Sequence, residues 1–400
     1  MRILLVAMAD SVHTARWMSQ ICDQGWDVHL FPSLDVGFGH PELRNCTVHH
    51  SIYSKQGKGN GSVRFSGIPV VHKTVAYFAR GLLRKYFRTY RVGQLVRTIK
   101  KLKPDLIHAM EIQAAGYLTV AARDKMQGEF PPSILTNWGS DIYLFGRLKE
   151  HEARIRETLG EFDYYSCECQ RDVTLAREYG FRGEILPVFP NGGGFNLEWV
   201  SGLRSPGLVS KRRSIVLKGY QNWAGRALVG IRALERCADL LKGYEVNIYS
   251  ADPDVGIAAE LCQRSTGIPI HIIPERSAHE VILRLHGRSR ISIGLSISDA
   301  ISTSFLEAIV MGSFPIQSCT SCADEWIVDG KTGILVPPED PEVVEMAIRR
   351  ALTDDDLVNR AAEANFEIAQ ERLDQRKLEE MATGIYSRVV RESRGKGKRS

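Results

Sequence analysis

The chain has 400 residues, of which 44% are hydrophobic and 25% are charged, and its formal net charge is +5. This composition excludes disordered and fibrous proteins, and the length predicts two globular domains with substantial cores. No apolar run reaches the ~18 residues that span a membrane, and the eight cysteines show no disulfide framework. The sequence therefore predicts a cytoplasmic protein.

The first half of the chain alternates short apolar runs with longer amphipathic segments. It begins with MRILLVAMAD, which becomes polar too soon for a signal peptide and predicts a first strand. The alternation is typical of βα units and a mostly parallel sheet. The predicted strands are residues 3–7, 28–31, 106–109, 133–136, 163–167 and 184–187. The predicted helices are residues 14–24, 73–102, 112–122 and 171–179.

This pattern stops at residue 195 and resumes at residue 214. The second series of predicted strands is 214–217, 245–249, 270–273 and 291–295, and the helices among them are 224–240, 255–264 and 278–285. Each half is expected to be a doubly wound α/β domain with helices on both faces of its sheet. The expected organisation is a domain at 1–195, a linker at 196–213, a second domain at 214–371, a C-terminal helix at 372–393 that crosses back to the first domain, and a disordered basic tail at 394–400.

One stretch, residues 291–317, combines a buried strand, a polar turn and a helix that ends at Gly312. Asp299 lies at the carboxyl end of the strand, and Glu307 lies eight residues later inside the helix. The first turn of the helix holds three hydroxyl residues, Ser302, Thr303 and Ser304. Helix N-terminal amides stabilise a diphosphate, and the two carboxylates can accept hydroxyl groups of a ribose and a sugar. The alternative is that Asp299 and Ser302 only cap the helix.

A second group of residues lies at an earlier strand–helix junction. Lys218 ends a predicted strand, Gly219 follows it, and Arg226 lies just inside the next helix. Two cations at this point suit a pyrophosphate, because they neutralise the charge that develops as a nucleoside diphosphate departs. The alternative is a pair of solvated basic residues at a strand–helix junction.

The 291–317 stretch resembles the E-x7-E region of retaining GT-B glycosyltransferases of the family 4 type, also called glycosyl transferases group 1. Asp299 and Glu307 match the two acidic positions, the first with one methylene fewer. The similarity continues through Gly312–Ser318, Asp324–Gly330 and Thr332–Pro337. The resemblance implies the GT-B fold, in which two Rossmann-like doubly wound domains face a cleft, an N-terminal one for the acceptor and a C-terminal one for the nucleotide sugar.

The same resemblance implies the reaction. A sugar would move from a nucleoside diphosphate sugar to a glycan or lipid-linked acceptor with retention, and without a metal or other cofactor. Glu307 would hold the ribose and Asp299 the donor sugar. Lys218 and Arg226 would stabilise the leaving diphosphate, and the leaving phosphate itself would act as the base.

In the first half, Ser11–Arg16 resembles the loop of this family near the acceptor, and Asn137–Ile142 resembles its H-G-S-D-type segment. Trp138 stands where many members carry a functional histidine. His13 and Asp141 are therefore candidates for holding a sugar on the acceptor side. The alternatives are a loop position for His13 and a helix cap for Asp141.

His108 and Glu111 close another predicted strand at the same edge of the first domain. They are further candidates on the acceptor side, although a histidine in such a place is more often a hydrogen-bonded core residue. For a divalent metal, Asp252-Pro-Asp254 matches a D-x-D pattern, but its acids precede a helix and are expected to cap it. No metal site is predicted.

The region from Asn45 to Pro104 contains many basic residues and no Asp or Glu. Within it, residues 73–90 predict an amphipathic helix with one apolar stripe and one stripe of arginines. This helix could rest on the anionic inner face of a membrane, or pack its apolar side into the domain and leave the arginines in water. A nucleic-acid partner is not expected, because no stacking platform accompanies the charge.

The sequence alone leaves two alternatives to a transferase. One is a GT-B epimerase or hydrolase acting on sugar nucleotides. The other is a non-catalytic GT-B partner subunit, suggested by Trp138 and by the unusual spacing of Lys218 and Arg226.

Overall fold

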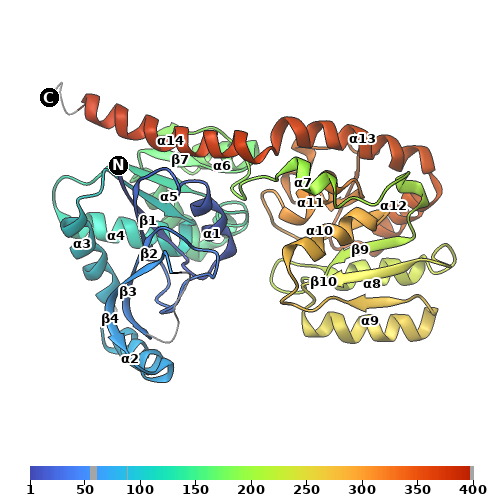
Figure 1. Ribbon diagram of the computed structural model, residues 1–400, viewed down its shortest axis with the longest axis horizontal. Coiled ribbons are helices and arrows are strands. Elements are labelled where there is room, and N and C mark those ends of the chain that lie inside the picture. The colour runs from blue at the N-terminus through green and yellow to red at the C-terminus, as the bar shows by residue number, and fades with distance from the viewer. Residues whose placement is uncertain (55–60, 88, 397–400) are drawn as a thin grey trace. The chain divides into compact units, whose positions relative to one another are not determined.

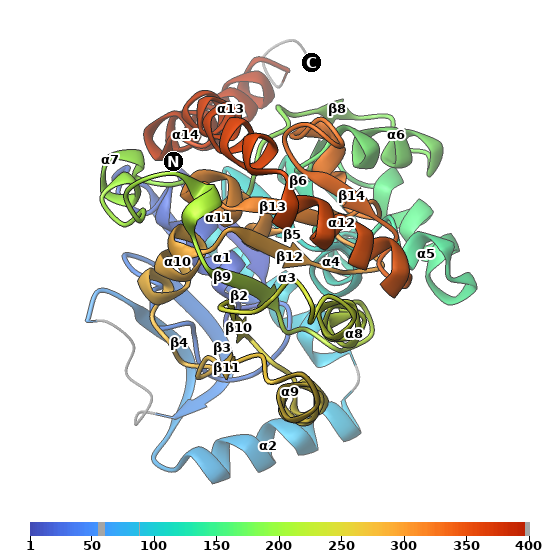
Figure 2. The same ribbon diagram turned by 90° about the vertical axis from the view of Figure 1, so that its right-hand side faces the viewer.

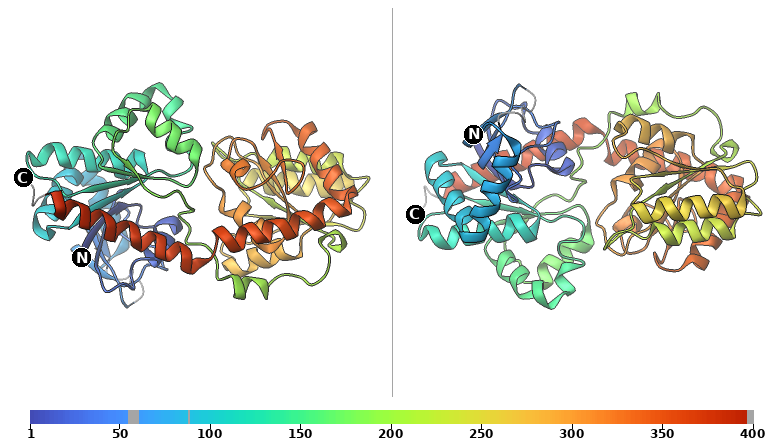
Figure 3. Two further views of the ribbon diagram at one scale, coloured as in Figure 1. Left: turned by 90° about the horizontal axis from the view of Figure 1, so that it is seen from above. Right: turned by 90° about the horizontal axis from the view of Figure 1, so that it is seen from below.

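The computed structural model describes residues 1–54, 61–87 and 89–396. The chain forms two compact units (Figure 1). The first comprises Met1–Gly194 together with the chain from Arg376 onward, and the second comprises Phe195–Gln375. Each unit is an α/β layer structure whose sheet carries helices on both faces (Figure 3). The prediction of a two-part α/β protein is therefore confirmed.

The sheet of the first unit has eight strands in the order β4-β3-β2-β1-β5-β6-β7-β8. All its pairings are parallel. The strands are β1 (Arg2–Ala7), β2 (Asp27–Pro32), β3 (Thr47–Ser54), β4 (Arg64–Val70), β5 (Leu106–Met110), β6 (Ser133–Thr136), β7 (Tyr164–Ser166) and β8 (Glu184–Ile185). The sequence did not predict β3 and β4. Side chains on the inward positions of β3 include His50 and Ser54, so the strand lacks a clear apolar alternation.

Helices of the first unit pack on both faces of this sheet. They are α1 (Val12–Ser19), α2 (Lys73–Tyr86), α3 (Tyr90–Leu102), the π-helical turn η1 (Ile112–Gly116), α4 (Tyr117–Met126), the short helix η2 (Phe145–Arg147), α5 (Lys149–Gly160), α6 (Gln170–Glu178) and α14 (Gln375–Lys396). The single helix predicted over 73–102 is thus two helices. One core contains α1 and α14, and the other contains α3, α4, α5 and α6.

The C-terminal helix α14 belongs to the first unit, although α13, which precedes it, belongs to the second. Tyr386 anchors it: Trp17 Nε1 donates a hydrogen bond to the Tyr386 hydroxyl at 2.7 Å, and His108 Nδ1 lies 2.6 Å from the same oxygen. All three side chains are buried. The predicted tail lies partly inside α14, and residues 397–400 lie outside the described residues.

The second unit has six parallel strands in the order β11-β10-β9-β12-β13-β14. The strands are β9 (Ser214–Lys218), β10 (Glu245–Tyr249), β11 (Ile270–Ile272), β12 (Ile291–Gly294), β13 (Phe314–Ser318) and β14 (Ile334–Val336). From β9 the chain adds β10 and β11 toward one edge of the sheet, and from β12 it adds β13 and β14 toward the other edge. The β9/β12 boundary is therefore the topological switch point, where doubly wound sheets bind ligands.

Helices cover both faces of the second sheet, with α8 and α9 on one side and α10 and α11 on the other (Figure 2). They are α7 (Leu197–Ser201), the short helix η3 (Val209–Lys211), α8 (Ala227–Arg236), α9 (Pro253–Thr266), α10 (His279–Arg288), α11 (Thr303–Met311), the short helix η4 (Cys322–Glu325), α12 (Pro341–Thr353) and α13 (Asp355–Arg372).

Residues 196–213, expected to be a linker, belong to the second unit. Val200 on α7 and Val209 on η3 are buried and belong to two hydrophobic clusters of that unit. The glycines and the proline in this segment suggested a free connection, but its few apolar side chains are enough to attach it to the core.

Candidate active site

Two loops meet at the switch point of the second unit, one leading from β9 to α8 and one from β12 to α11. The Arg226 amide donates to the Leu295 carbonyl at 3.0 Å, and the Ile297 amide donates to the Ala224 carbonyl at 2.9 Å. An antiparallel bridge joins Gly225 to Ser296 between them. The two loops therefore form one backbone-bonded surface at the carboxyl ends of the central strands.

Lys218 projects from the end of β9 to the N-terminus of α11. Its Nζ lies 3.3 Å from the Oγ of Ser302, and that oxygen lies 2.6 Å from Ser304 Oγ. Ser302 is the N-cap of α11, and the first amides bonded within the helix are those of Phe305 and Leu306. A cation and the positive end of a helix therefore coincide, which is the arrangement that binds phosphate groups.

Glu307 lies deeper in the same helix and is buried. Two histidines from α10 approach it: His279 Nε2 lies 2.6 Å from Oε1, and His286 Nε2 lies 3.6 Å from Oε2. Burial alone would raise the pKa of Glu307, but hydrogen bonding and charge from the two imidazoles outweigh it and lower the pKa to about 2. Glu307 is therefore a carboxylate at neutral pH, ready to accept hydrogen bonds.

Tyr249, at the end of β10, completes this polar group. It is the register partner of Lys218 on β9, and its ring lies edge-on to His286 with 5.7 Å between centroids. The sequence patterns did not indicate a role for His279, His286 or Tyr249. The two histidines are seven residues apart on one helix face, which is the signal that could have drawn attention to them.

Asp299 and Arg226 are placed differently from Lys218 and Glu307. Asp299 lies partly exposed in the β12–α11 loop, where its Oδ1 accepts a hydrogen bond from the Ala300 amide at 3.0 Å. Arg226 is the N-cap residue of α8; it forms an ion pair with Glu339 at 2.8 Å and donates to the Gly225 carbonyl at 2.9 Å. These contacts show Arg226 fixing the conformation of its own loop.

Gly219 allows the β9–α8 loop to lie against the loop that follows β10. A Cβ at this position would lie 2.6 Å from the Cα of Ala251. Beside it, Asp252 Oδ2 accepts a hydrogen bond from the Gln221 amide at 2.7 Å, and Asp252 is the N-cap residue of α9. Asp252 thus occupies the N-cap position, but its carboxylate bonds the β9–α8 loop rather than an amide of α9.

Two candidate acids of the first unit, Glu111 and Asp141, are buried at the carboxyl ends of β5 and β6. Glu111 has a φ of 81° and accepts hydrogen bonds from the amides of Ala114 and Ala115. Asp141 accepts from the amides of Ile112 and Trp138, both at 2.9 Å. Burial raises the pKa of both acids, and the negative charge of Glu111 raises that of Asp141 further.

The two candidate histidines of the first unit have different surroundings. His108 is fully buried, and its two ring nitrogens lie 2.6 Å from the Tyr386 hydroxyl and 2.6 Å from Thr136 Oγ1. It therefore occupies the position of a hydrogen-bonded core histidine, which was the alternative given for it. Burial lowers its pKa to about 3. His13 is exposed on α1, and its ring lies 5.6 Å from that of Trp138. The structure thus brings His13 together with Trp138.

In the amphipathic helix α2 the apolar stripe faces solvent, and its two arginines differ, since Arg80 is buried and Arg84 is exposed. Its apolar side chains, including Phe78 (64% exposed) and Tyr86 (67%), face solvent. Arg80 is buried and donates to the Ile52 carbonyl at 2.9 Å, while Arg91 of α3 is buried against the Phe31 ring. No helix in the described ranges is long and apolar enough to cross a membrane.

Family comparisons agree with this architecture. Residues 2–163 match the family described as Glycosyl transferase 4-like, and residues 263–367 match the family described as Glycosyl transferases group 1. Two glycosyl transferase models therefore match large parts of both units, and the chain is a glycosyltransferase with the GT-B fold. No significant match to a curated protein sequence was found.

Solved structures share the fold over nearly the whole chain. Sucrose-phosphate synthase from Thermosynechococcus elongatus has a TM-score of 0.72 at 15% identity, with 98% of this chain and 99% of that one covered. Anabaena HepE in complex with UDP-glucose has a TM-score of 0.65 at 14% identity, with coverage of 97% and 100%. The α,α-trehalose-phosphate synthase of Burkholderia xenovorans in complex with glucose-6-phosphate has a TM-score of 0.65 at 12% identity, with coverage of 97% and 100%.

Proposed function

We propose that the enzyme moves a hexosyl group from a nucleoside diphosphate sugar onto a glycan or lipid-linked acceptor, with retention of the anomeric configuration and without a divalent metal. The observation that carries the proposal is the position of Lys218 Nζ at the N-cap of α11, 3.3 Å from Ser302 Oγ. The departing group of the reaction is a nucleoside diphosphate, whose charge must be balanced in the transition state. A fixed cation and a helix N-terminus supply that balance.

The residues then have the following roles. Lys218 and the amides at Thr303 and Ser304 hold the diphosphate, and Glu307 accepts hydrogen bonds from the ribose hydroxyls. Asp299, in the loop between the two, contacts the donor sugar. The leaving phosphate oxygen takes the proton of the acceptor hydroxyl, so the enzyme needs no separate general base. Arg226 does not touch the substrate but acts indirectly, because its contacts keep the β9–α8 loop in place.

The first unit supplies the acceptor side, and we place the protein at an anionic membrane surface. The support is the exposed apolar face of α2 together with Arg84 and Lys85 in its last turn. Residues 45–104 add further cations and no acid. Each basic residue near an anionic bilayer contributes about 1 kcal/mol. Polysaccharide or lipid-linked glycan synthesis is the process that such a position serves.

The test is a product assay with purified enzyme and a panel of nucleoside diphosphate sugars, each with and without candidate acceptors. Uridine diphosphate sugars come first, because the HepE complex contains UDP-glucose. The proposal expects a glycosylated product whose anomeric configuration, read by NMR, matches that of the donor, and whose formation survives EDTA. Donor turnover without such a product would instead identify an epimerase or hydrolase.

A Lys218→Met variant connects the assay to the site. Its kcat should fall by about 10²–10³-fold, since the lost cation acts mainly on the departing diphosphate. Nucleotide binding without turnover in the unchanged protein would support a non-catalytic subunit.

A further inference from the structure

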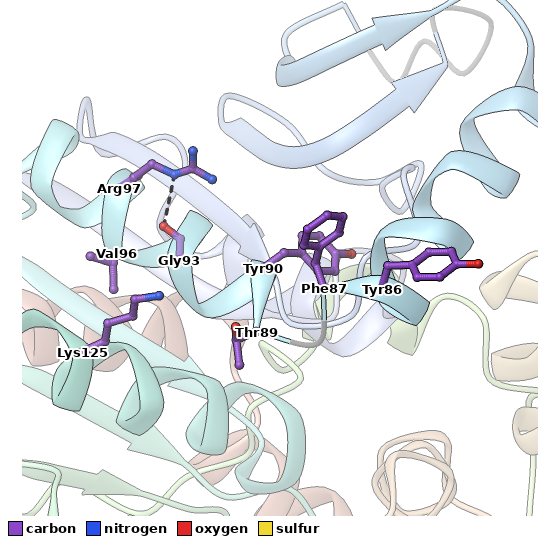
Figure 4. Close-up of a pocket in the computed structure, with 8 residues that line it drawn as sticks. All are labelled: Tyr86, Phe87, Thr89, Tyr90, Gly93, Val96, Arg97 and Lys125. Atoms are coloured by element: carbon purple, nitrogen blue, oxygen red, sulfur yellow. Dashed lines mark hydrogen bonds between the residues drawn. The ribbon is translucent and has the colours of Figure 1, made fainter.

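A cavity in the first unit lies where α2 ends and α3 begins, beside α4 (Figure 4). Its volume is about 640 Å³. The lining residues are Tyr86, Phe87, Thr89, Tyr90, Gly93, Val96, Arg97 and Lys125. They include two cations and three aromatic side chains, and no carboxylate.

The two cations lie on either side of Gly93, where α3 has no side chain. Arg97 Nε donates to the Gly93 carbonyl at 3.3 Å, and a Cβ on Gly93 would lie 3.6 Å from Lys125 Nζ. Within the described ranges, neither cation forms an ion pair with an acid. Two positive charges without an ion-pair partner among the described residues therefore line the same cavity.

One residue of the cavity wall, Tyr90, is bonded to a buried acid. The hydroxyl of Tyr90 donates to Asp35 Oδ2 at 2.7 Å, and Asp35 is buried beside Arg91. This contact fixes Tyr90 and turns the carboxylate of Asp35 toward the interior. It leaves the charge of Arg97 and Lys125 available to a ligand.

The other end of the cavity is apolar and open. Phe87 and Tyr86 are more than half exposed, and they continue the row of exposed apolar side chains along α2. In Figure 4 the cations stand at one end and the rings of Tyr86 and Phe87 at the other. Exposed aromatic rings next to a cavity indicate a binding surface, because a ligand that covers them removes apolar area from water, which is favourable in free energy.

We propose that this cavity binds an amphiphile with a phosphate-ester head and a hydrocarbon chain, the phosphate between Arg97 and Lys125 and the chain over Phe87 and Tyr86. A free phosphate would make no use of the aromatic end, and a neutral hydrocarbon would leave the two cations unpaired. Binding at this site requires neither a donor sugar nor catalysis, so it can be tested independently of the proposed reaction.

The experiment uses soluble ligands, so that binding in the cavity is distinguished from general adsorption to a bilayer. Calorimetric titrations of the full chain compare octyl phosphate, inorganic phosphate and octyl glucoside, each below its micelle concentration. One octyl phosphate should bind per chain, at least about tenfold more tightly than the other two. Equal affinity for inorganic phosphate or for octyl glucoside would overturn the proposal.

Matched variants locate the site. Arg97→Gln and Lys125→Gln should each weaken octyl phosphate binding by about tenfold, since each removes a charge-assisted hydrogen bond. Lys101→Gln is the control, because Lys101 is on the same helix but does not line the cavity. Its charge instead contributes to lowering the pKa of His49. An equal loss in Lys101→Gln would mean that only the general positive charge matters, and the site would be rejected.

Gly93→Leu tests the space without changing the charge. The substitution fills the gap between the cations, and leucine is a better helix former than glycine, so folding should not suffer. Octyl phosphate binding should be lost at an unchanged or higher melting temperature. A Gly93→Leu protein that binds octyl phosphate as the unchanged protein does would contradict the proposed position of the phosphate.

Discussion

His279 Nε2 and Glu307 Oε1 lie 2.6 Å apart, and this contact stands between the buried carboxylate and solvent. The imidazole is 40% exposed, whereas the Glu307 side chain is only 6% exposed. His279 fixes the orientation of the carboxylate. Under the proposed function, a ribose that donates hydrogen bonds to Glu307 would contact His279 as well.

The first prediction concerns this pair. Glu307→Gln should weaken binding of a nucleoside diphosphate by about 10- to 100-fold, because hydrogen bonds to a charged acceptor contribute ~1.5–3 kcal/mol. His279→Gln should have a smaller effect in the same direction. Isothermal titration calorimetry measures both. Glu363→Gln, at an exposed position of α13, is the control and should leave the affinity unchanged.

The second prediction concerns Gly219. Gly219→Ala should lower the melting temperature and weaken nucleotide binding, because the new methyl group would meet the backbone at Ala251 and displace the β9–α8 loop. Gly256→Ala is the matched control: this glycine lies in α9 with open space around it. It should stabilise the protein by about 0.5–1 kcal/mol. Differential scanning fluorimetry separates the two outcomes, and equal melting temperatures would contradict the steric argument.

The third prediction is a pH dependence of stability caused by His108. Its folded-state pKa of about 3 lies below the ordinary value of 6.5, so folding favours the neutral ring. Its stabilising contribution is complete above pH 6.5 and is lost progressively as the pH falls toward 3. Between pH 6.5 and 4.5 the loss amounts to roughly 2 kcal/mol. His108→Gln should flatten the plot of unfolding free energy against pH in this window, measured by urea denaturation.

The fourth prediction concerns the exposed face of α2. Phe78→Ser combined with Leu82→Ser should abolish sedimentation with anionic vesicles and leave the melting temperature unchanged, since both side chains already face solvent. Leu261→Ser is the control, because this leucine of α9 is 61% exposed, close to the 56% of Leu82. Equal binding to neutral and anionic vesicles at low salt would be evidence against the membrane role.

Local patterns predicted the part of the site that is local in sequence. The strand, polar loop and helix of 291–317 follow one another along the chain, and α11 begins and ends where its capping residues indicated. The partners of Glu307 come from α10, and nothing in the 291–317 stretch points to them. Contacts of this kind depend on how two helices pack, which the periodicity of one helix does not determine.

The basic region shows a second limit of sequence patterns. Arginine stripes are expected in water, yet Arg80 and Arg91 are buried because backbone carbonyls, an aromatic ring and Asp35 are there to receive them. Such partners come from β2, β3 and the loops after them, far away in sequence. Periodicity identified an amphipathic helix but could not determine which of its stripes faces the protein.

The position of α14 has a consequence for the order in which a newly made chain can fold. The core of the first unit includes Tyr386 and Val389, which leave the ribosome only after the whole second unit has been made. The second unit is continuous from Phe195 to Gln375 and can be completed before them. During synthesis the N-terminal half must therefore wait, incompletely covered, for α14, and a premature stop before α14 would leave the part made first without one of its core helices.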